Sequence, residues 1–141
     1  AKYFQGNRSP IDAEKDQTGY SLAWQHHKGH NPHHWEYWID NLGTYKNNAI
    51  KIPYEYVIEM ICDWLGAGIV YSKQKVDFGQ PYKEPLEYYK AHLPERIFNE
   101  ETQGLIEFYL EMIATSGINT FCNYVKGSNY TEADYRGEYL P

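Results

Sequence analysis

The chain has few cysteines, a deficit of positive charge and no long apolar run. Its two cysteines, Cys62 and Cys122, lie far apart in the sequence, without the spacing of a metal site or the density of a secreted disulfide framework. We therefore expect a reducing, cytoplasmic environment. No stretch reaches the roughly 20 apolar residues of a membrane span, and the mean hydropathy is −0.74, so no membrane partner is expected.

Positive charge is scarce: 13 Lys and Arg face 19 Asp and Glu, a formal net charge of −6. Binding to duplex nucleic acid needs a basic surface and is not expected. The motifs GxSxG, GxGxxG and CxxC and the Walker-type phosphate loop are also absent. The sequence therefore lacks the usual motifs of four classes: serine hydrolases, dinucleotide-binding proteins, thiol-redox proteins and P-loop proteins.

Hydrophobic residues make up 42% of the 141 residues, enough for one globular domain with its own core. Aromatic residues are unusually common at 17%, with 15 Tyr, 4 Trp and 5 Phe. Most of them can be explained as core residues, because each buries about 150 to 250 Å². The rest suit a surface that contacts a protein partner or a second copy of the chain.

The apolar pattern predicts an all-α fold, a small single-domain helical bundle with irregular loops. Helices are expected at about 20–29, from Pro32, from Pro53 to about 70, at 84–92 and, capped by Asn99, at 100–115. Residues 40–52 are interpreted as a loop or irregular hairpin. We expect a helical, His-rich domain over 1–115 and an extended arm or tail over 116–141, where no clean period occurs.

The helix from Pro53 has the strongest pattern. Apolar residues recur at helical spacing and predict its core-facing side; they are Tyr54, Ile58, Ile61, Leu65 and Ile69. Asp63 falls roughly opposite this stripe, with Met60 and Ala67 among its expected neighbours. An acid in an apolar setting needs a partner, which a metal ion, a basic side chain or a backbone donor would supply. Alternatively, Glu55, Glu59 and Asp63 form a solvated stripe at spacing four.

Five of the six histidines fall within nine residues, in the run HHKGHNPHHW: His26, His27, His30, His33 and His34. His26 and His30, or else His27 and His30, lie on one helical face and can share a metal ion. Either His33 or His34 is expected to join them, though not both, because neighbouring helical side chains point about 100° apart. The alternative is a cluster of imidazoles packed among the aromatic residues.

Carboxylate ligands would complete such a site. Asp63 is the first candidate, as ligand and catalytic acid or base, and Glu59 is the second. Cys62 is expected in the core rather than as a nucleophile, His92 at the surface rather than as a ligand, and Lys28 in solvent rather than on a phosphate.

The run AWQHHKGHNPHHWEYW, followed by IPYEYVIEMICDWLGAG and a YYKAH segment, resembles an uncharacterised family of small bacterial and phage proteins over about residues 1–115. That family is similar in turn to diverged HD-type metal phosphohydrolases. The resemblance implies an HD-like fold and a divalent ion such as Mn, Fe, Zn, Ni or Mg. It also implies ligands at His26, His30 and His33 or His34, with Asp63 as the distal acid. Family members typically carry a further His-Asp pair, in a context similar to HDLSKF, upstream of the segment that matches AKYFQG.

Two functions are therefore expected as alternatives. The first is a metal-dependent hydrolase of a nucleotide or another small phosphate ester, in a bacterial cytoplasm, or in a host cell or virion if a phage encodes it. The second is a non-catalytic structural or interaction protein, whose histidines hold a structural ion or pack. Its aromatic surface and C-terminal arm would then meet a partner chain or a second copy.

Overall fold

The computed structural model describes residues 15, 17, 31–40, 49–127 and 129–138. The described part is all-α, as predicted, and has no strand. Its elements in chain order are η1 (Trp35–Trp38), α3 (Tyr54–Val70), α4 (Glu84–His92), η2 (Leu93–Glu95), α5 (Glu100–Ser116), α6 (Ile118–Lys126) and α7 (Tyr130–Arg136). None of the helices in these ranges is both long and apolar enough to cross a membrane.

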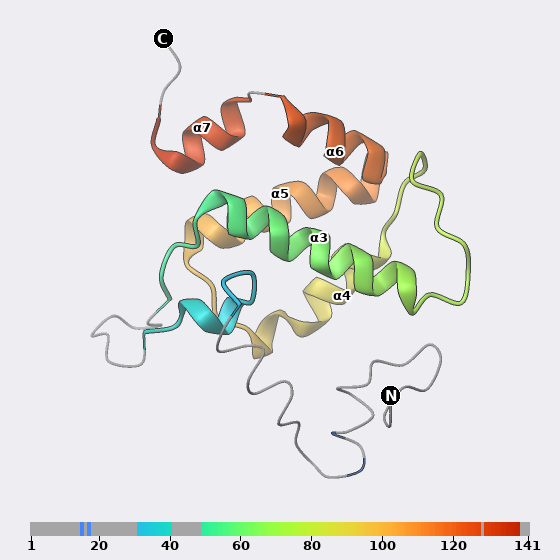
Figure 1. The fold of residues 1–141 in the computed structure, drawn as a ribbon, viewed down its shortest axis with the longest axis horizontal. Helices are drawn as coiled ribbons and strands as arrows, with labels where there is room; N and C mark the ends of the chain where they lie inside the picture. Colours follow the sequence, from blue (N-terminus) through green and yellow to red (C-terminus); the bar gives the residue numbers. More distant parts are fainter. Residues whose placement is uncertain (1–14, 16, 18–30, 41–48, 128, 139–141) are drawn as a thin grey trace.

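Helix α5 is the centre of the bundle. It packs against α3, α4, α6 and α7, and Figure 1 shows α3 crossing it while α6 and α7 cover its other side. Ile106, Tyr109, Leu110 and Ile113 of α5 have no exposed surface. Such a helix, buried on most of its circumference, depends on its neighbours for stability.

Local sequence explains where these helices begin. Pro53 precedes α3 with a φ of −55°, and Pro85 stands in the first turn of α4, where proline's missing N–H costs nothing. The Asn99 side chain accepts hydrogen bonds from the backbone N–H groups of Glu101 and Thr102 and so caps α5. The predicted bounds of α3, α4 and α5 are confirmed.

The core face of α3 is rotated slightly from the predicted stripe. Tyr54, Ile61 and Leu65 are buried as expected, whereas Ile58 and Ile69 are only partly buried. Their places are taken by Val57 and Met60, both at most 1% exposed. The side of α3 that faces solvent is therefore rotated as well, and it includes Asp63.

Two predicted elements are wrong. The helix expected from Pro32 is a turn followed by the short 3₁₀ helix η1, because His34 is extended, with φ −103° and ψ 136°. The stretch expected as an arm or tail forms α6 and α7 as far as Arg136. These helices bury Ile118, Phe121 and Tyr135 in the common core, and that burial stabilises helices too short to persist alone.

The irregular hairpin prediction agrees with the two ends that are described. Ile39 and Ala49 form an isolated antiparallel bridge, and the Ile50 N–H donates to the Trp38 carbonyl at 2.9 Å. The residues between them, 41–48, lie outside the described part of the chain. This bridge connects η1 to the segment that leads into α3.

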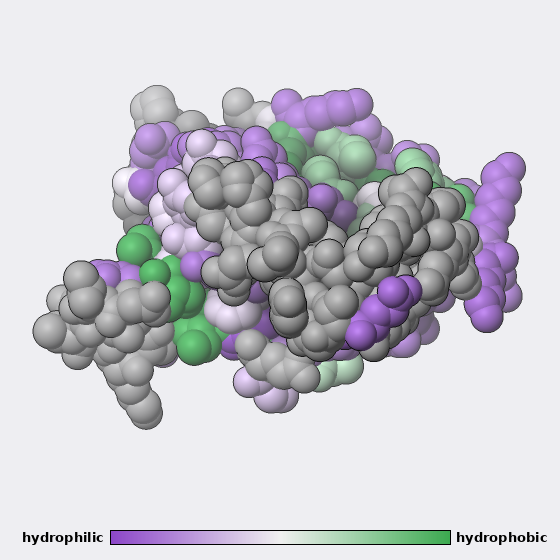
Figure 2. All heavy atoms as spheres, turned by 60° about the horizontal axis from the view of Figure 1, so that its bottom comes forward, coloured by the Kyte–Doolittle hydropathy of each residue, from purple (hydrophilic) through white to green (hydrophobic). Residues whose placement is uncertain are grey.

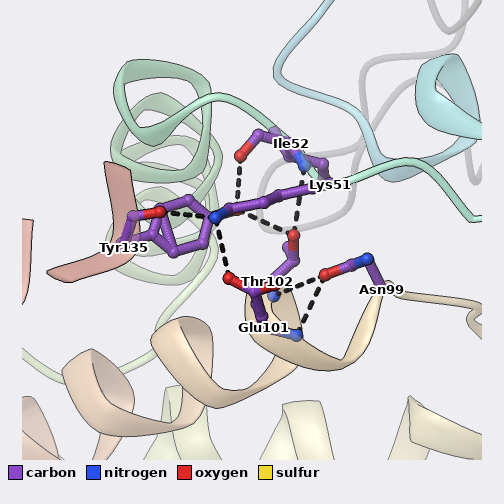
Figure 3. A network of polar contacts seen from close by, with 6 residues as sticks. All are labelled: Lys51, Ile52, Asn99, Glu101, Thr102 and Tyr135. Carbon is purple, nitrogen blue, oxygen red and sulfur yellow. Dashed lines mark hydrogen bonds and ion pairs between the residues drawn. The ribbon is translucent and has the colours of Figure 1, made fainter. Parts of the chain in front are cut away.

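Polar contacts around Tyr135 fasten α7 to the start of α3 and α5 (Figure 3). Its hydroxyl donates to the Ile52 carbonyl and lies 2.8 Å from Thr102 Oγ1, which also accepts from the Ile52 N–H. Lys51 Nζ donates to Glu101 Oε2 at 2.7 Å and to the Tyr135 carbonyl. Burial raises the pKa of Tyr135, so its hydroxyl keeps the proton that it donates.

The surface carries large hydrophobic side chains as well as charge. Figure 2 shows hydrophobic groups in separate patches between hydrophilic ones on one face of the molecule. Among described residues the most exposed are Val70 and Tyr130, each at 67%, and Tyr88 at 58%. Single exposed apolar residues are normal in soluble proteins.

Candidate metal centre

His33, His34 and Asp63 come together in the fold. One potential ligand atom from each side chain lies within 4.8 Å of those of the other two. The histidines belong to the turn before η1, and Asp63 belongs to the middle of α3. Two segments on either side of the Ile39–Ala49 bridge thus supply two imidazoles and one carboxylate to the same place.

Both histidines approach Asp63, so the expectation that only one of them can is wrong. That expectation assumed a helix through His33 and His34, whereas this stretch is a turn with His34 extended. The 100° rotation between helical neighbours does not apply to it. The two rings instead lie with their centroids 4.7 Å apart.

Glu59 lies one helical turn before Asp63 on α3. Its Oε2 is 3.7 Å from His33 Nδ1, with the side chains 55% and 22% exposed, respectively. A carboxylate beside an imidazole can fix the orientation and tautomer of a ligating ring or act as a ligand itself. Glu59, the second acid expected from the sequence, lies at the edge of the cluster.

Asp63 is exposed, so the prediction that apolar neighbours surround it is wrong. Met60, one of those neighbours, turns into the core instead. Glu55, Glu59 and Asp63 form an exposed stripe at spacing four, which is the alternative arrangement. Only its last two members face the histidines, since Glu55 pairs with Arg136 at 3.5 Å.

The donor set fits a divalent ion of the borderline class. Imidazole nitrogens suit Zn, Fe and Ni, and a carboxylate extends the range to Mn. Donors bound to one tetrahedral ion are about 3 to 4 Å apart, and the 4.8 Å limit here is slightly wider. Small side-chain rotations would close that difference. Two histidines and one carboxylate also leave coordination positions for water and a substrate.

Aromatic side chains hold the histidine turn against the bundle. Trp38 Nε1 donates to the Pro32 carbonyl at 2.6 Å and closes the turn. Its ring lies 5.9 Å from that of Tyr56 on α3, and the Trp35 ring lies 6.1 Å from that of Phe98. This positioning role was not expected from the sequence, although the two tryptophans three apart after HNPHH were a signal for it.

The other predicted ligands, His26, His27 and His30, lie outside the described residues, as does Lys28. Of the remaining candidates, Cys62 is exposed on α3, so its predicted core position is wrong. Partial burial still raises the pKa of the Cys62 thiol, and a raised pKa disfavours the thiolate that a nucleophile needs.

His92 lies away from this cluster, at the end of α4. Its ring stacks on Tyr88 with centroids 3.9 Å apart, and its Nδ1 is 2.8 Å from the Tyr88 carbonyl. These contacts to one residue of its own helix give it a local structural role.

Comparison with known proteins gives a family without a known activity. No curated protein and no solved structure matches the chain. One family model, described as a family of unknown function, matches residues 1–112. The match includes the histidine run, Glu59 and Asp63, and it ends within α5. Because it covers most of the 141 residues, the chain belongs to this family, DUF5662.

Proposed function

We propose that the chain is a metal-dependent phosphohydrolase of the HD-like type, acting on a nucleotide or another small phosphate ester. The observation that carries the proposal is the convergence of His33, His34 and Asp63 within 4.8 Å. The sequence resemblance to HD-type enzymes supports the reaction class. A bacterial or phage origin and a cytoplasmic location belong to the same proposal.

Each residue has a chemical role in this proposal. His33, His34 and Asp63 would hold the ion, and His26, His27 and His30 are further candidate ligands. A bound divalent ion would lower the pKa of a water molecule and would polarise a phosphoryl oxygen. Glu59, 3.7 Å from His33 Nδ1, orients that ring and accepts the proton of the attacking water. Asp63 is the second carboxylate that can take this proton.

The decisive variant is Asp63→Asn, which removes the carboxylate charge and preserves shape. We expect metal content, measured by elemental analysis, to fall well below that of the unmodified protein, and phosphate release from a nucleotide panel to be lost. Glu59→Gln should reduce metal affinity or activity by about 10- to 100-fold, the usual effect of losing a residue that orients a ligand.

Asp134→Asn is the matched control. It makes the same change in charge as Asp63→Asn, at an exposed position on α7. It should retain full metal content and activity. Absence of bound Mn, Fe, Zn, Ni and Mg from the purified protein, together with no phosphate release after metal is added, would refute the proposal.

A non-catalytic protein with a structural ion is the second candidate, because His33, His34 and Asp63 could hold an ion that only stabilises the fold. Its exposed hydrophobic side chains include Tyr130 and Val70. These suit a protein partner or a second copy of the chain. The two candidates differ in how a chelator acts. Removing a structural ion should lower the melting temperature strongly, whereas removing a catalytic ion should abolish turnover with only modest destabilisation.

A further inference from the structure

Arg96 lies between α4 and α5 and is held by aromatic rings rather than by an acid. Its guanidinium carbon is 5.0 Å from the centroid of the Trp64 ring and 5.8 Å from that of Tyr88. Its backbone is extended, with φ −121° and ψ 144°. Ring faces attract and orient a guanidinium without neutralising its charge.

One nitrogen of the Arg96 guanidinium lacks a hydrogen-bond acceptor. Nη1 of Arg96 is shielded from solvent and has no hydrogen-bond partner, and no acid in the described ranges forms an ion pair with Arg96. A shielded guanidinium N–H without an acceptor is unfavourable. The planar fork of donors matches two oxygens of a phosphate or carboxylate.

The segment between α4 and α5 contacts the residues that follow two of the candidate ligands in the sequence. Arg96 lies over Trp64, the residue after Asp63, and the Phe98 ring lies 6.1 Å from that of Trp35, the residue after His34. In Figure 1, η1 and the end of α4 both lie below α3, which agrees with these contacts.

We infer that Arg96 is the anion-binding residue of this centre and that its guanidinium pairs with phosphoryl oxygens of a phosphate-containing substrate. The inference rests on the proposed function and adds the residue that selects the substrate class. An anionic substrate needs such a group, because the chain carries a net charge of −6 and Glu59 and Asp63 lie at the site.

The test is a calorimetric titration of the full chain with inorganic phosphate, after elemental analysis of each sample. Arg96→Gln should raise the dissociation constant for phosphate about tenfold or more, the effect of one charge-assisted hydrogen bond or greater. In turnover with a phosphate ester, KM should rise by a similar factor and kcat should change less. Metal content should equal that of the unmodified protein.

Lys90→Gln is the matched control: it removes one positive charge from an exposed position on α4 and should leave phosphate binding unchanged. Arg96→Lys keeps the charge and loses the fork, so it should weaken phosphate binding by less than Arg96→Gln. If Arg96→Gln does not fold, Arg96→Lys decides.

Three results overturn the inference: no phosphate binding by the unmodified protein, phosphate binding by both Arg96 variants as tight as that of the unmodified protein, or a loss in Lys90→Gln equal to that in Arg96→Gln. Failure of the proposed function has a different signature, since a chain without metal or turnover can still bind phosphate through Arg96. That result would support Arg96 as an anion site while refuting the hydrolase.

Discussion

The hydroxyl of Tyr135 joins three parts of the chain. It donates to the Ile52 carbonyl, so the Thr102 hydroxyl is the donor in the 2.8 Å contact between them. The side chain is 6% exposed, and water therefore cannot replace either partner easily. Lys51 Nζ lies 4.5 Å from the centroid of the Tyr135 ring.

Tyr135→Phe should therefore destabilise the fold by about 1 to 3 kcal/mol, since the Ile52 carbonyl and Thr102 hydroxyl lose a buried partner. Tyr130→Phe makes the same change on α7 at a position that is 67% exposed and should have almost no effect. Urea denaturation of both variants measures the difference. Equal stabilities for the two would show that the Tyr135 network contributes nothing.

Residue type made the candidate ligands recognisable in the sequence, but the backbone determined how they are arranged. His33, His34, Glu59 and Asp63 carry the right chemistry wherever they lie, so they were identifiable. Both histidines converge because the chain forms a turn at Pro32 and not a helix. The pair Asn31-Pro32 is equally compatible with either structure. The exposure of Asp63 depended on Met60 turning inward, a choice made by packing.

At the scale of the element, the junction between α5 and α6 depends on one glycine. Gly117 has φ +92° and ψ 170°, a conformation that is accessible essentially only to glycine. A Cβ there would lie 2.6 Å from the carbonyl oxygen of Gln80. The close approach lets the segment before α4 reach α6, where the Asn119 N–H donates to the Phe78 carbonyl at 2.9 Å.

Gly117→Ala should therefore cost at least about 1 to 3 kcal/mol through backbone strain, with the clash adding to it. Gly104→Ala is the contrasting variant within α5, where a Cβ meets nothing within 4 Å. It should stabilise the protein by up to about 1 kcal/mol, because alanine favours the helix. In thermal unfolding, we expect the melting temperature to fall in Gly117→Ala and to rise in Gly104→Ala. An unchanged melting temperature in Gly117→Ala would contradict the prediction.

The longer helices were predictable because each carries its own signals: a proline or asparagine at the start and an apolar period over several turns. Helix α6 has the same kind of pattern, with Ile118, Phe121 and Val125 at helical spacing, over only nine residues. Helix α7 has only seven. Such short segments do not form stable helices alone, and a single sequence does not show the surface on which they fold.

At the scale of the whole molecule, α6 and α7 complete the core even though the family match ends at residue 112. A chain cut after Ser116 loses the burial of Ile118, Phe121 and Tyr135, roughly 5 to 9 kcal/mol of hydrophobic stabilisation. That is comparable to the total stability of a typical domain. We expect the shortened chain to lose its cooperative thermal transition, as followed by circular dichroism.

Adding a peptide of residues 117–141 to the shortened chain is the control. It should restore helix content if the loss comes from the missing contacts rather than from the cut itself. A chain of residues 1–116 that melts with the same midpoint as the full chain would show that α6 and α7 are dispensable.

The contact between Tyr135 and Ile52 joins positions 83 residues apart. During synthesis, Ile52 is added to the chain 83 residues before Tyr135, whose hydroxyl donates to its carbonyl. The bundle therefore cannot close around α5 until nearly the whole described chain has been translated. Until then the apolar faces of α3 and α5 stay exposed to solvent, and molecular chaperones can bind them on the nascent chain.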